Sequence, residues 1–154
     1  MVLQYWQSRA RTGSVPSFSE IASALHSPES KGVLGSQIKR YLTSLDYRVF
    51  IFKGQWGDIK NHVSKGRPLI VALGNPHDLD HYVVVAGWDS DEHVVLVNDP
   101  ARRKLLKLDQ VRFMSSWSQT SCWTLLALPA STATNLPSPD TSRDSSNPGD
   151  PALP

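Results

Sequence analysis

Two apolar stretches joined by a short polar linker constrain the fold of this chain more than any other feature. The segments "HYVVVAGW" (81–88) and "EHVVLVN" (92–98) are joined by "DSDE". Apolar runs of this length around a four-residue polar loop are typical of a β-hairpin. Because both runs are apolar at consecutive positions, we expect the sheet to be covered on both faces.

The segments around the hairpin supply further strands and the covering helices. Ser17 with Glu20 three positions later predicts a capping box that opens a short helix, and "MVLQYW" at the start reads like the middle of another. Ile38, Tyr41 and Leu42 begin an apolar stripe with helical spacing. Further helices are predicted at 55–66 and 108–117, and strands at 47–52, 67–73, 104–108 and 122–128. Helices first and an antiparallel sheet after them give an α+β fold.

Length and composition indicate one domain followed by a tail. The chain has 154 residues, 40% of them hydrophobic, which is enough for one core. Residues 130–154 are rich in Pro, Ser, Thr and Asp and hold too little apolar surface to offset the entropy of ordering. We therefore predict a domain over residues 1–129 and a disordered tail over 130–154, and we expect a monomer.

Several functional classes are excluded by composition. The net charge is only +2 and the basic residues are scattered, so no nucleic-acid partner is expected. The longest apolar run, 82–86, is too short to span a membrane. One cysteine cannot form an internal disulfide, and no phosphate-binding glycine loop is present. No cofactor is predicted, and a cytoplasmic location is favoured.

His81 and Asp99 are the candidate site residues. Thiol and hydroxyl nucleophiles need a base within hydrogen-bond reach and a third group that orients that base. His81 begins one strand of the hairpin and Asp99 follows the other, so the reversal of direction should bring them to one edge of the sheet. The alternative is a histidine at a strand end and an aspartate that opens an Asp-Pro turn.

The other ionisable candidates lack partners in the sequence. Cys122, placed in the last strand with no helix start beside it, reads as a small hydrophobic residue. His62 lies on a predicted helical face, His93 is expected to alternate within a strand, and His26 is unpaired.

A metal site in the loop before the hairpin is a weaker alternative. His77, Asp78, Asp80 and His81 are clustered in sequence. No second cluster completes four ligands, so we interpret the loop as a solvated turn and predict no metal.

Read together, these segments resemble the double-glycine leader peptidases, papain-like cysteine peptidases that form the N-terminal domain of bacteriocin-exporting transporters and also occur alone. "DHYVVVAGWD" is similar to the motif around the catalytic His of that family, and "VNDPA" to the motif around its orienting Asp. "GRPLIVAL" and "VRFMSSWS" agree in order and spacing, and the resemblance extends from residue 1 to about Pro129.

The resemblance implies that His81 is the general base and that Asp99 orients it. The family's nucleophile lies in a Cys-Gly-Pro segment at the start of the first helix, after a Gln that donates to the oxyanion hole. "MVLQYW" is similar to the continuation of that helix, so both groups are absent from this chain, and Met1 is interpreted as an internal methionine of a longer protein. The chain as printed should therefore be inactive.

The implied substrate is a leader peptide cleaved after Gly-Gly, and the implied partner is a membrane export transporter. The alternative is a catalytically dead peptidase-like module that binds a peptide or a transporter.

Overall fold

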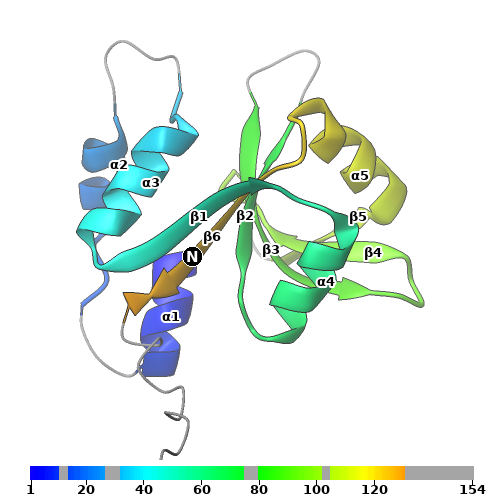
Figure 1. The fold of residues 1–154 in the computed structure, drawn as a ribbon, viewed down its shortest axis with the longest axis horizontal. Coiled ribbons are helices and arrows are strands. Elements are labelled where there is room, and N and C mark those ends of the chain that lie inside the picture. Colours follow the sequence, from blue (N-terminus) through cyan, green and yellow to red (C-terminus); the bar gives the residue numbers. More distant parts are fainter. Residues whose placement is uncertain (11–13, 27–31, 75–79, 102–104, 131–154) are drawn as a thin grey trace, which may run out of the picture.

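A six-stranded antiparallel sheet organises the chain (Figure 1). In this computed structural model, the residues described are 1–10, 14–26, 32–74, 80–101 and 105–130. The strands follow the order β1-β6-β2-β3-β4-β5. Their bounds are β1 Tyr47–Lys53, β2 Leu69–Leu73, β3 His81–Asp89, β4 Val94–Asn98, β5 Leu105–Asp109 and β6 Trp123–Pro129. Within the described residues every strand pair is antiparallel, which confirms the predicted α+β class.

The helices lie on both sides of this sheet. Their bounds are α1 Val2–Ala10, α2 Phe18–Leu25, α3 Gly35–Ser44, α4 Trp56–Ser64 and α5 Gln110–Gln119. The predicted capping box of α2 is present, since Ser17 Oγ accepts from the Glu20 N–H and the Glu20 carboxylate accepts from the Ser17 N–H. Gly66 ends the turn after α4 at φ +64°, where a side chain would be strained.

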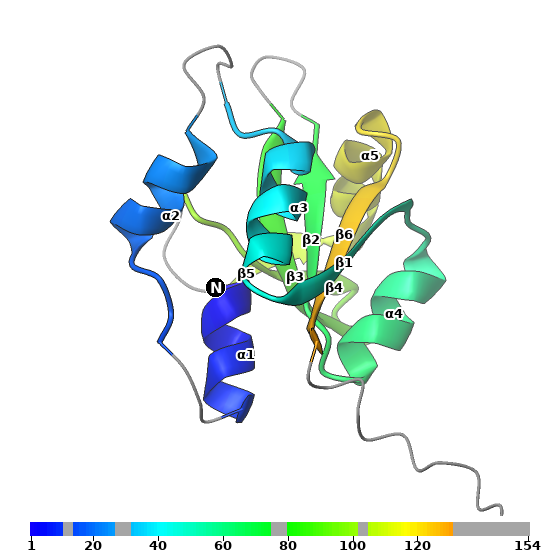
Figure 2. The same cartoon turned by 60° about the vertical axis from the view of Figure 1, so that its left-hand side comes forward.

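Two apolar clusters fix the helices against the sheet. On one face, α4 and α5 supply Ile59, Phe113 and Trp117, which are almost fully buried against β2, β3 and β4. On the other face, α1 and α3 pack against β3 and β6 (Figure 2). Since side chains alternate along a strand, Val83 and Val85 belong to the first cluster and Val84 to the second.

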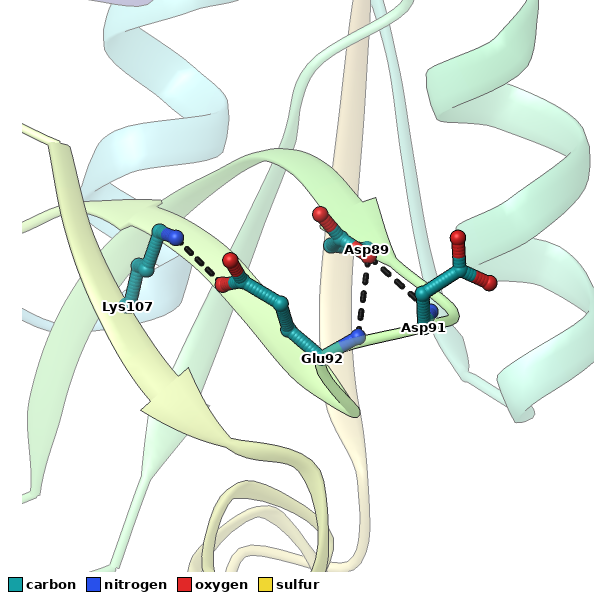
Figure 3. A network of polar contacts seen from close by, with 4 residues as sticks. All are labelled: Asp89, Asp91, Glu92 and Lys107. Carbon is teal, nitrogen blue, oxygen red and sulfur yellow. Dashed lines mark hydrogen bonds and ion pairs between the residues drawn. The ribbon is translucent and has the colours of Figure 1, made fainter.

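The hairpin between β3 and β4 differs from the prediction by one residue. Its turn covers residues 90–93, so His93 lies in the turn at φ +52° rather than in a strand, and that prediction was wrong. The Asp89 carboxylate accepts hydrogen bonds from the Asp91 and Glu92 N–H groups and closes the turn (Figure 3). Glu92 also pairs with Lys107 of β5, which ties the turn to the neighbouring strand.

Coverage of the sheet is less complete than the apolar runs predicted. Val83, Val84 and Val85 are all buried, as expected for a strand covered on both faces. In β4, however, only Val95 and Val97 are fully buried, and the other three residues of the strand are half-buried. The β4 part of the sheet is therefore fully covered only on the α4 and α5 side.

The predicted tail falls almost entirely outside the described residues, which end at Ala130. Ala130 itself, assigned to that tail, donates its N–H to the carbonyl of Asp46 at 3.0 Å.

Candidate active site

Strands β3 and β4 bring His81 and Asp99 into contact. Val84 pairs with Asn98, so the residue that follows Asn98 lies beside the first residues of β3. His81 Nε2 is 2.6 Å from Asp99 Oδ1, a short hydrogen bond of the charge-assisted kind. The sequence prediction that the two residues meet at one edge of the sheet agrees with this contact.

The contact determines which nitrogen of His81 is available as a base. An ionised carboxylate only accepts hydrogen bonds, so Nε2 carries the proton when the ring is neutral. Nδ1 then keeps its lone pair and is the atom able to accept a proton. Asp99 is itself held, because its Oδ1 also accepts from the N–H of Ala101 at 2.8 Å.

The two members of the pair differ in exposure. The side chain of His81 is 39% exposed, whereas that of Asp99 is only 12% exposed. The carboxylate therefore lies behind the ring, and the ring is open to an approaching group. Asp99 also lines a cavity of about 510 Å³ between β5 and α5, where it is joined by Leu73, Phe113 and Ser116.

Helix α1 runs in the direction that leads away from His81. Val2 packs in the same cluster as Val84 of β3. One turn later, the Tyr5 hydroxyl donates to the carbonyl of Gly66, just before the start of β2. Since the start of β2 pairs with Val85, α1 passes along β3 from the side of His81 toward the opposite end.

Comparison with known proteins identifies the family of the chain. A family model described as the Peptidase_C39 like family matches residues 1–125. The chain belongs to this family. Curated proteins give no significant match to the sequence.

Solved structures with the same fold include two peptidase domains of ComA. The domain from a Streptococcus ComA, described as a bi-functional ABC transporter involved in a quorum sensing pathway, has a TM-score of 0.64 and 20% identity and covers 83% of this chain and 88% of its own. The domain from Streptococcus mutans ComA has a TM-score of 0.57 and 19% identity, and covers 72% of this chain and 86% of its own. At these identities the likeness establishes the fold alone. It confirms the predicted papain-like α+β fold, with helices packed on an antiparallel sheet.

Cys122 lies in the turn before β6, and β2 lies between β6 and the strand of His81. It precedes β6 in a turn at φ +55°, so its assignment to the strand was wrong. It packs half-buried against the cluster under α4 and α5, as expected for a small hydrophobic residue. Strand β2 separates β6 from β3, so two strand spacings, roughly 10 Å, lie between Cys122 and His81. Among the described residues no hydrogen bond joins the Cys122 side chain to His81, whose Nε2 is bound to Asp99.

The other histidines among the described residues lie apart from the pair in the fold. His62 is on α4 with its ring against Phe52, and its Nδ1 is buried without a hydrogen-bond partner among the described residues. Burial lowers the pKa of His62, and the nearby Arg67 charge lowers it further. His26 ends α2, where its N–H donates to Ala22.

The described residues bear on the metal and membrane predictions only in part. His77 and Asp78 of the candidate cluster lie outside them, and in the part that is described no three His, Cys, Asp or Glu residues are grouped closely enough to hold an ion. None of the described helices has the length and apolarity needed to cross a membrane.

Sequence reasoning did not identify the contacts that hold β2 beside His81. Ser116 of α5 donates to the carbonyl of Gly74, 42 residues away in the chain. Local patterns carry no signal for such a pair, because it depends on where α5 docks on the sheet. The phenol of Tyr82, which accepts a hydrogen bond from the backbone of Gly35, was missed for the same reason.

Proposed function

We propose that this chain is the cysteine peptidase domain of a double-glycine leader peptidase, with His81 as general base and Asp99 as the residue that orients it. The observation that carries the proposal is the 2.6 Å contact between His81 Nε2 and Asp99 Oδ1 in a member of the Peptidase_C39 like family. The partly exposed ring offers Nδ1 to a nucleophile.

The reaction follows from this geometry. His81 Nδ1 accepts the proton of a thiol, and the thiolate sulfur attacks the carbonyl carbon of the second glycine of the Gly-Gly pair. The peptide C–N bond breaks, the imidazolium returns its proton to the leaving amine, and a thioester remains. His81 then takes a proton from water, whose oxygen attacks the thioester, and the proton returns to the sulfur as the leader is released. Asp99 stabilises the imidazolium formed in each half-reaction.

The thiol has to reach His81 at the end of the sheet. Alternation along β3 places Tyr82 and Val84 on the α1 face and His81 on the other face, so a thiol on an upstream extension of α1 has to approach the ring past the start of β3. Three strand residues, roughly 10 Å, separate the levels of His81 and Val84. A helix rises about 1.5 Å per residue, so about six or seven helical residues before Val2 would reach the level of His81. We propose that the nucleophile belongs at this upstream helical position, because β2 lies between Cys122 and His81 in the sheet.

The proposed substrate is a peptide with a Gly-Gly leader, and the proposed partner is a membrane export transporter. The two solved structures compared above are peptidase domains of ComA, and the Streptococcus ComA is described as a bi-functional ABC transporter. The fold shared with those domains supports the same kind of association for this chain.

The test adds a helical segment before Val2 that places a cysteine about seven residues upstream. A fluorogenic peptide ending in Gly-Gly before the reporter is the substrate, and a matched peptide with Ala-Ala is its control. We expect turnover of the Gly-Gly peptide by the extended chain, and none by the 154-residue chain or by the extended chain with that cysteine replaced by alanine.

The base assignment is tested in the same assay. His81→Ala in the extended chain should remove turnover, while His93→Ala, in the exposed turn, should leave it unchanged. Full turnover by the His81 variant would exclude His81 as the base. Binding of the peptide by every variant, with turnover by none, would instead favour a binding module.

A further inference from the structure

Helix α5 holds the end of β2 through side chains and backbone together. The Ser116 hydroxyl donates to the Gly74 carbonyl at 2.6 Å, and the Gly74 N–H donates back to the Ser116 carbonyl at 2.9 Å. Thr120 Oγ1 donates to the carbonyl of Ala72 at 2.7 Å. A β-carbon on Gly74 would lie 2.5 Å from the side chain of Gln119, so the helix and strand approach as closely as a glycine allows.

This attachment lies beside the His81–Asp99 pair. Leu73, the last residue of β2, pairs directly with His81, and Gly74 follows it. The Ser116 hydroxyl therefore contacts β2, the strand that sets the position of His81. Ser116 also borders the cavity that Asp99 lines.

The attachment matters because, among the described residues, few other contacts restrain the ring. His81 is the first residue of its strand, and its side chain is 39% exposed. Tyr82 is only half-buried against Trp123, and the first almost fully buried residue of β3 is Val83. A short hydrogen bond depends on tenths of an ångström, so movement of the β2 end would lengthen the Nε2 to Oδ1 contact.

We propose that Ser116 is a positioning residue. Its hydrogen bond to Gly74 fixes the end of β2, which pairs with His81 and so keeps the ring in contact with Asp99. The inference rests on the proposed function only in that His81 is taken as the base. The contact itself is a property of the folded chain, so it is measurable in the 154-residue protein without any nucleophile.

The experiment follows the Nε2-bound proton of His81 by ¹⁵N and ¹H NMR on the 154-residue chain labelled at histidine. In the wild type this proton should be shifted downfield and protected from exchange with water. Ser116→Ala should speed its exchange at least threefold and move it upfield. Ser118→Ala is the matched control, since that hydroxyl donates only to Ser115 within the same helix, and it should change neither quantity.

A merely structural role is distinguished by two further comparisons. Ser116→Thr keeps the hydroxyl and should keep the His81 Nε2 proton protected. Ser116→Val has nearly the shape of the threonine variant but no hydroxyl, and it should lose that protection. This pair decides the question if Ser116→Ala fails to fold. Backbone amide protection in α1 and α3 should stay unchanged in the folded variants. Unchanged exchange at His81 in Ser116→Ala or Ser116→Val, or uniform loss of protection across the fold, would overturn the proposal.

Failure of this proposal and failure of the proposed function give different results. Turnover that survives His81→Ala in the extended chain would remove the base assignment and leave the NMR result standing. An NMR result that does not depend on Ser116 would remove the positioning role and leave peptidase activity intact.

Discussion

Two glycines three residues apart should respond to the same substitution with opposite signs. Gly54 lies between β1 and α4, and a β-carbon there would lie 2.5 Å from Thr124 Oγ1 and 2.6 Å from the ring of Trp117. Both of those residues are fully buried, so neither is able to move away freely. Gly57, in the first turn of α4, has nothing within 4 Å of the same position.

The magnitudes follow from packing and helix propensity. Forcing a methyl group into a filled core costs about 1–3 kcal/mol. The reduced entropy of the unfolded chain offsets about 0.4–1 kcal/mol of that, so Gly54→Ala should lower the free energy of unfolding by roughly 1–2 kcal/mol. Gly57→Ala meets no neighbour and places a better helix former in α4, so it should raise the free energy of unfolding by about 0.5–1 kcal/mol.

Urea unfolding followed by tryptophan fluorescence measures both changes. The midpoints should move in opposite directions while the slopes stay equal, because a single methyl group hardly alters the surface exposed on unfolding. Equal shifts of the same sign, or a neutral Gly54→Ala, would show that the core around Trp117 is looser than the contacts indicate.

Three other predictions concern pH, capping and the site. Because burial lowers the pKa of His62 below its unfolded value of about 6.5, stability should be fully present above that pH and decrease as the pH falls. His62→Leu should therefore flatten the fall in melting temperature between pH 7.5 and pH 5.5, and an unchanged slope would contradict this. Ser17→Ala should cost about 1 kcal/mol locally; since α2 has no fully buried residue, the loss should appear as faster hydrogen exchange in α2 with little change in global unfolding. At the site, Asp99→Asn should keep much of the protection of the His81 Nε2 proton, because an amide oxygen can also accept it, whereas Asp99→Ala should speed its exchange about tenfold. Equal exchange in the two variants would show that the contact does not hold the ring.

The sequence predicts best the parts of the fold that neighbours in the chain determine. The stripe of Ile38 and Leu42 and the capping box at Ser17 depend on spacings of three or four residues, and both elements are present. His81 and Asp99 were expected to meet because a hairpin reverses the chain, and that reversal depends only on a short loop.

Features set by long-range docking were not predictable in the same way. Strand β6 lies between β1 and β2, and no local pattern selects that order. The turn conformations of His93 and Cys122 have positive φ values; histidine is only enriched at such positions, and cysteine gives no signal for them. The hydrogen bond from Ser116 to Gly74 depends on where α5 packs on the sheet, and the local sequence pattern does not determine that position.

The arrangement separates what stabilises the fold from what aligns the site. Gly54, Trp117 and Thr124 lie in the core, so changes there should lower stability and leave the His81–Asp99 contact intact in the molecules that remain folded. The Ser116 hydroxyl donates to the end of β2, so its loss should disturb the His81–Asp99 contact more than the free energy of unfolding. Comparing Gly54→Ala with Ser116→Ala in both assays tests this directly. If the core variant disturbs the Nε2 proton as much as the helix variant does, alignment of the pair depends on the whole fold rather than on the end of one strand.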